Sequence, residues 1–192
     1  MKTIKDKIAY HSRRLFDEHG YHGAALREVC KLAGCKMPTV YYHYKNKENL
    51  FDEAVRAAFE ELVARLWAQL PKEVSGKEYY IAMVKQKKHL SEDERIIYRL
   101  ALKTWLGFES CGGSRQKLRE WEELAYRKTL ENCAGIAGSV QWAKFIARSV
   151  TGIIQRIILM DDDIPDSEIE EEISMIFDVA THSNIKKPIG KD

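Results

Sequence analysis

Apolar residues recur at three- or four-residue spacing along almost the whole chain, and strict alternation over a strand-length window is rare. Near the end, for example, Ile169, Ile173 and Ile176 fall on one stripe at helical spacing. Glycine and proline number only 11 and 4 among 192 residues, which disfavours a turn-rich β design. The sequence therefore predicts an all-α protein, with about nine helices.

Capping residues and breakers divide the chain into these helices. Thr3 and Asn46 are suited to be N-caps, and Ser91 with Glu94 three residues later has the pattern of a capping box. The predicted helices cover about residues 4–20, 26–33, 37–44, 47–70, 77–89, 92–111, 114–132, 139–160 and 166–181. The expected stops are Gly20, Gly34, Pro71 and the pair Gly112-Gly113.

Basic side chains are concentrated in the first quarter of the chain. Residues 1–50 carry ten Lys and Arg against five Asp and Glu, whereas the net charge of the whole chain is only +2. Four of the six histidines, His11, His19, His22 and His43, also lie there. A small basic segment can bind a polyanionic partner through its positive charge. The alternative is a basic surface that only faces solvent.

Signatures of an enzyme or a metal site are absent from the sequence. It contains no Glu-x-x-His, no Gly-x-Gly-x-x-Gly, no Walker A loop and no Gly-x-Ser-x-Gly. The run of aspartates at residues 161–163 lacks the spacing of a calcium loop, which favours a solvated helix end. We expect no catalysis, no cofactor and no metal.

The sequence also indicates where the protein acts. Residues 1–14 are rich in Lys and Arg without the apolar stretch of a signal peptide, and no apolar run approaches the length of a membrane helix. The four cysteines show no Cys-x-x-Cys motif, as expected of reduced thiols. We expect a cytoplasmic protein that does not enter a membrane.

The strongest local signal lies in residues 23–47. Two short helices joined at Gly34 form a helix-turn-helix pattern, in which glycine supplies the positive φ of the turn. On the second helix, Val40 and Tyr44 share one face and are expected to point inward. The residues left toward solvent are Met37, Thr39, Tyr41, Tyr42 and His43. Side chains of these types can bind the phosphates and base edges of DNA.

The first 50 residues resemble the tetracycline-repressor (TetR) family of transcriptional regulators. The matching strings are Leu15-Phe16-Asp17-Glu18-His19-Gly20-Tyr21, Leu26-Arg27-Glu28-Val29, Ala33-Gly34 and Thr39-Val40-Tyr41-Tyr42-His43-Tyr44-Lys45-Asn46-Lys47-Glu48-Asn49-Leu50. The resemblance implies a homodimer with a helix-turn-helix DNA-binding domain in residues 1–47 and an effector-binding and dimerisation domain in residues 48–192.

The resemblance also implies which residues contact DNA. They are Arg27, Lys36, Met37, Pro38, Thr39, Tyr41, Tyr42, His43 and Lys47. Ala24 and Ala25 stand where the family usually has Thr or Ser, and Lys36 and Pro38 replace its usual Ser and Gly. These departures alter the preferred operator and not the class of protein. Cys35 is interpreted either as a small core residue or as a redox-active thiol.

Two further groups of residues are predicted in the second domain. The candidate effector pocket consists of Leu62, Tyr98, Leu102, Trp105, Phe108, Trp121, Tyr126, Trp142 and Phe145, and core packing is the alternative for each of its aromatic residues. The candidate dimer interface consists of Val150, Ile153, Ile154, Ile157, Ile169, Ile173, Ile176 and Phe177, which extend two apolar helix faces.

These observations predict a homodimeric regulator, most simply a repressor, that binds a palindromic DNA operator and is released by a small apolar or aromatic effector. A helical small-molecule-binding protein without a DNA role is the alternative.

Overall fold

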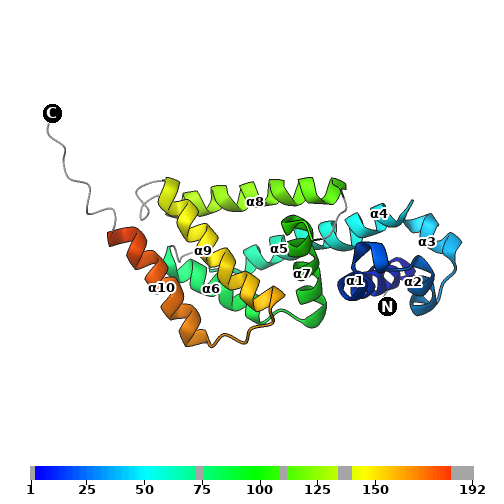
Figure 1. Cartoon of the computed structure of the whole chain (residues 1–192), viewed down its shortest axis with the longest axis horizontal. Helices are drawn as coiled ribbons and strands as arrows, with labels where there is room; N and C mark the ends of the chain where they lie inside the picture. Colours follow the sequence, from blue (N-terminus) through cyan, green and yellow to red (C-terminus); the bar gives the residue numbers. More distant parts are fainter. Residues whose placement is uncertain (1–2, 72–75, 109–111, 134–139, 183–192) are drawn as a thin grey trace. The chain divides into compact units, whose positions relative to one another are not determined.

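A computed structural model describes residues 3–71, 76–108, 112–133 and 140–182, and every regular element in these ranges is a helix (Figure 1). The elements are α1 (Ile4–Gly23), α2 (Leu26–Ala33), α3 (Met37–His43), α4 (Lys47–Phe51), η1 (Asp52–Ala57), α5 (Ala58–Gln69), α6 (Lys77–Lys88), α7 (Glu92–Leu106), α8 (Gly112–Cys133), α9 (Val140–Leu159) and α10 (Asp166–His182). The π-helical turn η1 joins α4 to α5 without a break, so these ranges contain nine continuous helices. The predicted fold class is confirmed.

The N-caps expected from the sequence form as predicted. The Thr3 hydroxyl accepts a hydrogen bond from the Asp6 amide at 3.2 Å, and the Asn46 side chain accepts one from the Asn49 amide at 2.7 Å. Ser91 likewise forms its capping box at the start of α7. Each cap satisfies an amide that has no partner within its helix, which stabilises a helix by about 1 kcal/mol.

One predicted helix end marks a break within a longer element, and another is wrong. Gly20 adopts a positive φ of 71° and interrupts α1 where the sequence predicted its end, although helical structure resumes as far as Gly23. The helix predicted to end at Gly112 stops at Leu106, because Gly107 adopts a φ of 91° and its amide bonds back to α7 carbonyls. Gly112 instead begins α8. Spacing alone does not show which of several glycines takes the left-handed conformation that ends a helix.

The chain divides into two compact units, which are described separately. Unit 1 contains Met1–Trp67 and Leu90–Trp121, and unit 2 contains Ala68–His89 and Glu122–Asp192. The predicted DNA-binding domain, residues 1–47, therefore lies in unit 1 together with η1, most of α5, and α7. The boundary placed near residue 47 remains a prediction.

In unit 1, α1 packs against α2, α4, η1 and α7. Phe16, Leu50, Phe51 and Leu100 are almost completely buried in the shared core. The ring of Phe16 meets that of Phe51 edge-on, with 5.0 Å between their centroids. Burying side chains of this size contributes about 1.5 to 3 kcal/mol each. The core therefore fixes α1, which supports the helix-turn-helix.

In unit 2, α6, α9 and α10 pack against one another. Isoleucines dominate the core, and Ile146, Ile158 and Ile173 are completely buried. Ion pairs surround the chain between α9 and α10: Arg156 contacts Asp162 at 3.1 Å, and Lys88 contacts Asp163 at 3.4 Å. These aspartates belong to the run predicted to be a solvated helix end, and in the structure they form ion pairs with basic side chains.

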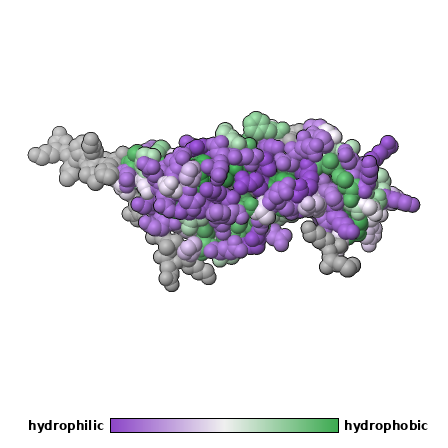
Figure 2. Space-filling model, turned by 90° about the horizontal axis from the view of Figure 1, so that it is seen from below, coloured by the Kyte–Doolittle hydropathy of each residue, from purple (hydrophilic) through white to green (hydrophobic). Residues whose placement is uncertain are grey.

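The surface is mixed in character. Figure 2 shows hydrophilic residues over most of the visible face, with hydrophobic side chains exposed in smaller groups among them. Among the described residues, no helix combines the length and the apolar character needed to cross a membrane.

Candidate nucleic-acid interface

The turn between α2 and α3 is the structural basis of the site. Gly34 adopts a φ of 68°, in the left-handed region that glycine enters without strain. The next amide, of Cys35, donates to the Cys30 carbonyl at 2.9 Å, so the end of α2 is closed over the turn. The chain then enters α3 with Pro38 in the first helical turn. The predicted helix-turn-helix is confirmed.

One face of α3 is anchored to the rest of unit 1. Val40 and Tyr44 are both buried, as their spacing predicted. The Tyr44 hydroxyl donates to the Lys5 carbonyl of α1 at 3.3 Å, and burial raises the pKa of Tyr44 to about 12. Because this face is occupied by the core, the opposite face of α3 points outward.

The outward face of α3 carries aromatic and polar side chains. Tyr42 is 85% exposed and Tyr41 is 48% exposed, which is unusual for such large rings. The Tyr42 ring meets that of His43 edge-on, with 5.1 Å between their centroids. Lys36 and Pro38 are exposed, and Thr39 and His43 are partly exposed. This face presents hydroxyl, imidazole and ammonium groups, which can bind phosphates and base edges.

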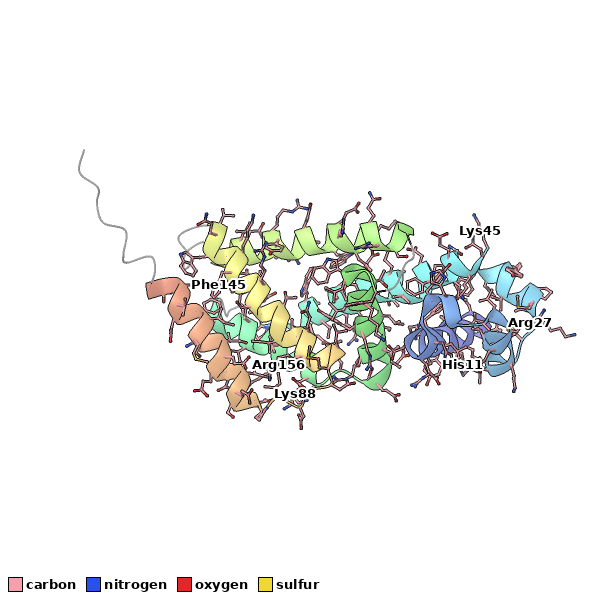
Figure 3. The ribbon with its side chains drawn as sticks, in the orientation of Figure 1. His11, Arg27, Lys45, Lys88, Phe145 and Arg156 are labelled. Carbon is pink, nitrogen blue, oxygen red and sulfur yellow. The ribbon has the colours of Figure 1, made fainter. Side chains whose placement is uncertain are left out.

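Basic side chains flank this face. Figure 3 shows Arg27 on α2 and Lys45 after α3 with their side chains extending outward, and both residues are exposed. Lys47 is different, because it is half-buried and its ammonium donates to the His22 carbonyl at 3.3 Å. This ammonium also lies 5.0 Å from the centre of the Tyr21 ring, and burial lowers the pKa of Lys47. Lys47 thus binds the end of α1, in addition to any contact with a phosphate.

Met37 is less exposed than the sequence predicted. It is half-buried, packs against the core of unit 1, and its sulfur accepts from the Cys30 thiol at 3.4 Å. A flexible thioether can fill an irregular gap of this kind beside α2. The predicted contact of Met37 with bases stays a prediction.

The helix-turn-helix is held by α7 as well, which sequence reasoning missed. Arg13 of α1 pairs with Asp93 at 2.8 Å, and Asp17 pairs with Lys103 at 3.0 Å. The partners in each pair are separated by 80 residues or more in the sequence. No local sequence pattern indicates which acidic residue pairs with which basic residue, although the sequence contains both charges.

The residues of the predicted effector pocket are divided between the two units. In unit 1, Tyr98 and Trp121 each contact Phe59, at centroid distances of 5.1 and 6.3 Å, and Trp67 lies 5.2 Å from Trp121. Phe59 and Trp67 were not among the predicted residues. Burial raises the pKa of Tyr98 to about 12. We call Phe59, Trp67, Tyr98 and Trp121 the aromatic cluster.

The other predicted pocket residues lie elsewhere. In unit 1, Leu62 and Leu102 are buried, Trp105 is half-buried, and Phe108 is 76% exposed, which places Phe108 on the surface and not in an enclosed site. In unit 2, Tyr126 and Trp142 are half-buried and Phe145 is exposed, with the Trp142 and Phe145 rings 5.5 Å apart.

The predicted dimer interface is largely buried within unit 2, and its role between two copies stays a prediction. Ile176 is half-buried, but the other seven residues are covered by their own chain within unit 2. The buried residues are Val150, Ile153, Ile154, Ile157, Ile169, Ile173 and Phe177. Helical spacing identifies an apolar face without showing whether its own chain or a second copy covers it. The exposed apolar residues of α9, α10 and their connection are Val140, Phe145, Met160, Met175 and Val179.

Comparison with known proteins agrees with the geometry of the first helices. Residues 11–54 match the family model described as bacterial regulatory proteins, tetR family. The chain is 34% identical over 59 residues to the biofilm operon icaADBC HTH-type negative transcriptional regulator IcaR of Staphylococcus aureus (strain Newman), covering 31% of this chain and 32% of that protein. It is 37% identical over 60 residues to IcaR of Staphylococcus epidermidis, with the same shares covered.

The fold as a whole also has relatives. A crystal structure of a transcriptional regulator from Rhodococcus sp. Rha1 is similar, with a TM-score of 0.70 and 21% identity, covering 94% of this chain and 97% of that one. The sequence matches span only about a third of the curated relatives. The family model covers the residues of the helix-turn-helix. Through these helices, the chain is similar to the tetR family of bacterial regulatory proteins.

Proposed function

We propose that this protein is a DNA-binding transcriptional regulator that acts in the cytoplasm. The observation that carries the proposal is the outward face of α3, where Tyr41 and Tyr42 are exposed on a helix anchored by Val40 and Tyr44. The family match covers the same helices. In a helix-turn-helix, this second helix enters the major groove of DNA and its side chains contact base edges.

Repression is the direction of regulation that we propose. The matched relatives from both Staphylococcus species are named as negative transcriptional regulators. A protein that occupies an operator prevents transcription by occlusion, which needs no further contact with the transcription machinery. The exposed Arg27 and Lys36 supply contacts to the DNA backbone for such occupation.

A homodimer is the proposed state on DNA. Met175 and Val179 are one helical turn apart on α10 and both are exposed, which leaves apolar surface for a second copy. On α9, no atom outside the neighbouring backbone of the helix itself lies within 4 Å of the position that a Cβ of Gly152 would occupy, which leaves room for another helix to approach closely. A two-fold dimer places two recognition helices about 34 Å apart, on successive turns of a palindromic site.

The aromatic cluster is the proposed place for effector recognition. Rings from three helices of unit 1 meet there, and unit 1 also contains the helix-turn-helix. A flat apolar molecule that inserts among these rings would change the packing of α5 and α7, and α7 is bound to α1 by ion pairs. Such coupling typically amounts to about 1 to 3 kcal/mol, and DNA must weaken effector binding by the same factor.

A mobility-shift assay tests the DNA-binding proposal. The wild-type chain is titrated into a duplex taken from upstream of its own gene, with a scrambled duplex as competitor. We expect Tyr42→Ala to weaken the specific complex at least about 10-fold, because a good base contact contributes about 1 to 3 kcal/mol. Phe108→Ala is the matched control, since Phe108 is a similarly exposed ring of unit 1 outside the helix-turn-helix.

The control and the competitor decide the outcome. Equal loss of binding in both variants would indicate a general effect of removing a surface ring. Binding that is equally strong on the scrambled duplex would contradict a sequence-specific regulator. A wild-type chain that shifts no duplex at all would favour a small-molecule-binding protein without a DNA role.

A further inference from the structure

Three sulfur atoms meet at the turn between α2 and α3. The Cys30 thiol donates to the Met37 sulfur at 3.4 Å, and it lies near enough to the Cys35 thiol to raise the pKa of that group. Neither cysteine forms a disulfide. We call Cys30, Cys35 and Met37 the sulfur cluster.

The backbone holds the sulfur cluster together. The Cys35 amide donates to the Cys30 carbonyl at 2.9 Å, and the left-handed Gly34 between them makes this closure possible. Met37 follows two residues later as the first residue of α3. Two thiols and a thioether from one eight-residue stretch therefore converge because of the turn itself, before any ligand is bound.

The chemistry of these donors selects a class of ion. Thiolate and thioether are soft ligands, and they favour Cu(I) over the harder divalent metals. Structural zinc sites take four ligands from Cys, His and carboxylate side chains, a set that does not include the thioether of Met37. From the convergence of these three sulfurs, we propose that the sulfur cluster binds one Cu(I) ion.

Access and charge are compatible with this ion. Cys30 is buried, but Cys35 and Met37 are half-exposed, which leaves a route from solvent. On binding, Cu(I) forms bonds to the three sulfurs, and the two thiol protons leave to solvent. The site changes from neutral to a net charge of −1, and residues 1–50, with ten basic side chains against five acidic ones, provide a favourable environment for that charge.

Oxidation to a disulfide is the competing use of two neighbouring thiols. Burial, followed by the proximity of Cys30, raises the pKa of the Cys35 thiol. Peroxide reacts with the thiolate, so a raised pKa slows that reaction. Cu(I) must also displace these protons, so its binding weakens as the pH falls.

Copper binding is expected to influence DNA binding, because the ligand Met37 begins the recognition helix. This consequence rests on the proposed function. Copper binding itself does not rest on the proposed function, because it is measured without DNA. A chain that fails to bind copper can therefore be distinguished from a chain that fails to bind DNA.

The test is an anaerobic competition titration of the reduced full-length chain against bathocuproine disulfonate, a coloured Cu(I) chelator. The parent variant carries Cys111→Ser and Cys133→Ser, so that only Cys30 and Cys35 can supply thiolates. We expect it to withdraw one Cu(I) per chain from the chelator, with only sulfur neighbours in X-ray absorption spectra. An excess of Zn(II) should not displace the ion.

Single substitutions in this parent then locate the site. Loss of an outer-shell partner already costs about 10- to 100-fold in metal affinity, so Cys35→Ser should weaken Cu(I) binding by at least about 100-fold. Met37→Leu preserves the apolar packing of α3 and removes only the thioether, and it should weaken binding about 10-fold. Circular dichroism confirms that each variant is helical before titration.

Two results would overturn the proposal. One is a parent chain that takes no Cu(I) from the chelator. The other is retention of full affinity by the folded Met37→Leu and Cys35→Ser variants, which would place copper at some other group.

Discussion

The one buried lysine among the described residues is Lys87 of α6. Its side chain is buried, with only 2% of the residue exposed, and its ammonium donates to the Gln86 side chain at 3.3 Å. Its neighbours on the helix are paired with carboxylates, Lys85 with Glu170 and Lys88 with Asp166. Burial lowers the pKa of Lys87 from 10.5 to about 8.

The lowered pKa of Lys87 makes the free energy of unfolding depend on pH. One pKa unit corresponds to about 1.4 kcal/mol, so a lowering from 10.5 to about 8 costs the folded state about 3 kcal/mol at pH 7. Between these two pKa values the unfolded chain binds more protons than the folded chain. Stability therefore rises with pH through this window, as the folded state no longer holds a buried charge.

Replacing Lys87 with methionine removes the charge and keeps a long flexible side chain. We expect Lys87→Met to raise the free energy of unfolding by about 3 kcal/mol at pH 7 and by only about 1 kcal/mol at pH 10. Urea unfolding followed by circular dichroism measures both values. The protein concentration is held fixed, because the stability of a dimer depends on it.

Lys85→Met on the same helix is the matched control. It removes a partly exposed lysine that contacts Asp166 and Glu170, so stability should fall by at most about 1 kcal/mol. A Lys87→Met variant that is less stable than wild type at pH 7 would show that the charge of Lys87 does not destabilise the folded state. A gain in stability that is the same at pH 7 and pH 10 would show that a buried charge is not its cause.

Three further predictions follow from the local geometry. Gly34→Ala places a Cβ at a φ of 68°, which should lower the free energy of unfolding by about 1 to 2 kcal/mol in a thermal melt; an unchanged melt would contradict a strained turn. Leu100→Ala empties a completely buried site and should cost about 2 to 5 kcal/mol in urea unfolding, whereas a cost below 1 kcal/mol would contradict its core position. Arg27→Ala should leave stability within about 0.5 kcal/mol and reduce the salt slope of DNA binding by about 0.9; an unchanged slope would remove Arg27 from the phosphate contacts.

The parts of the fold that the sequence predicted are those governed by local rules. Thr3 and Asn46 cap their helices because a short polar side chain next to a free amide needs no long-range information. Val40 and Tyr44 are buried because helical spacing places them on one face. The helix-turn-helix follows from the same rules and from Gly34.

The features that the sequence did not predict depend on which helix faces pack against one another in the folded chain. Ile173 was assigned to a dimer interface and is buried in its own unit, since an apolar stripe has the same spacing in either case. Met37 was expected to face solvent, but it is partly buried, because its sulfur accepts from the Cys30 thiol and its side chain packs against the core of unit 1. The pairing of Arg13 with Asp93 joins residues 80 positions apart and has no local signal.

One equilibrium measurement shows whether this chain binds DNA sequence-specifically through its helix-turn-helix. The binding of a fluorescent duplex from upstream of its own gene is followed by anisotropy over a range of salt concentrations, beside a scrambled duplex. We expect log K to fall linearly with log salt, by about 0.9 for each phosphate contacted. At physiological salt, the upstream duplex should bind at least about 1,000-fold more tightly than the scrambled one. Equal affinity for the two duplexes, or no binding at low salt, would contradict the claim.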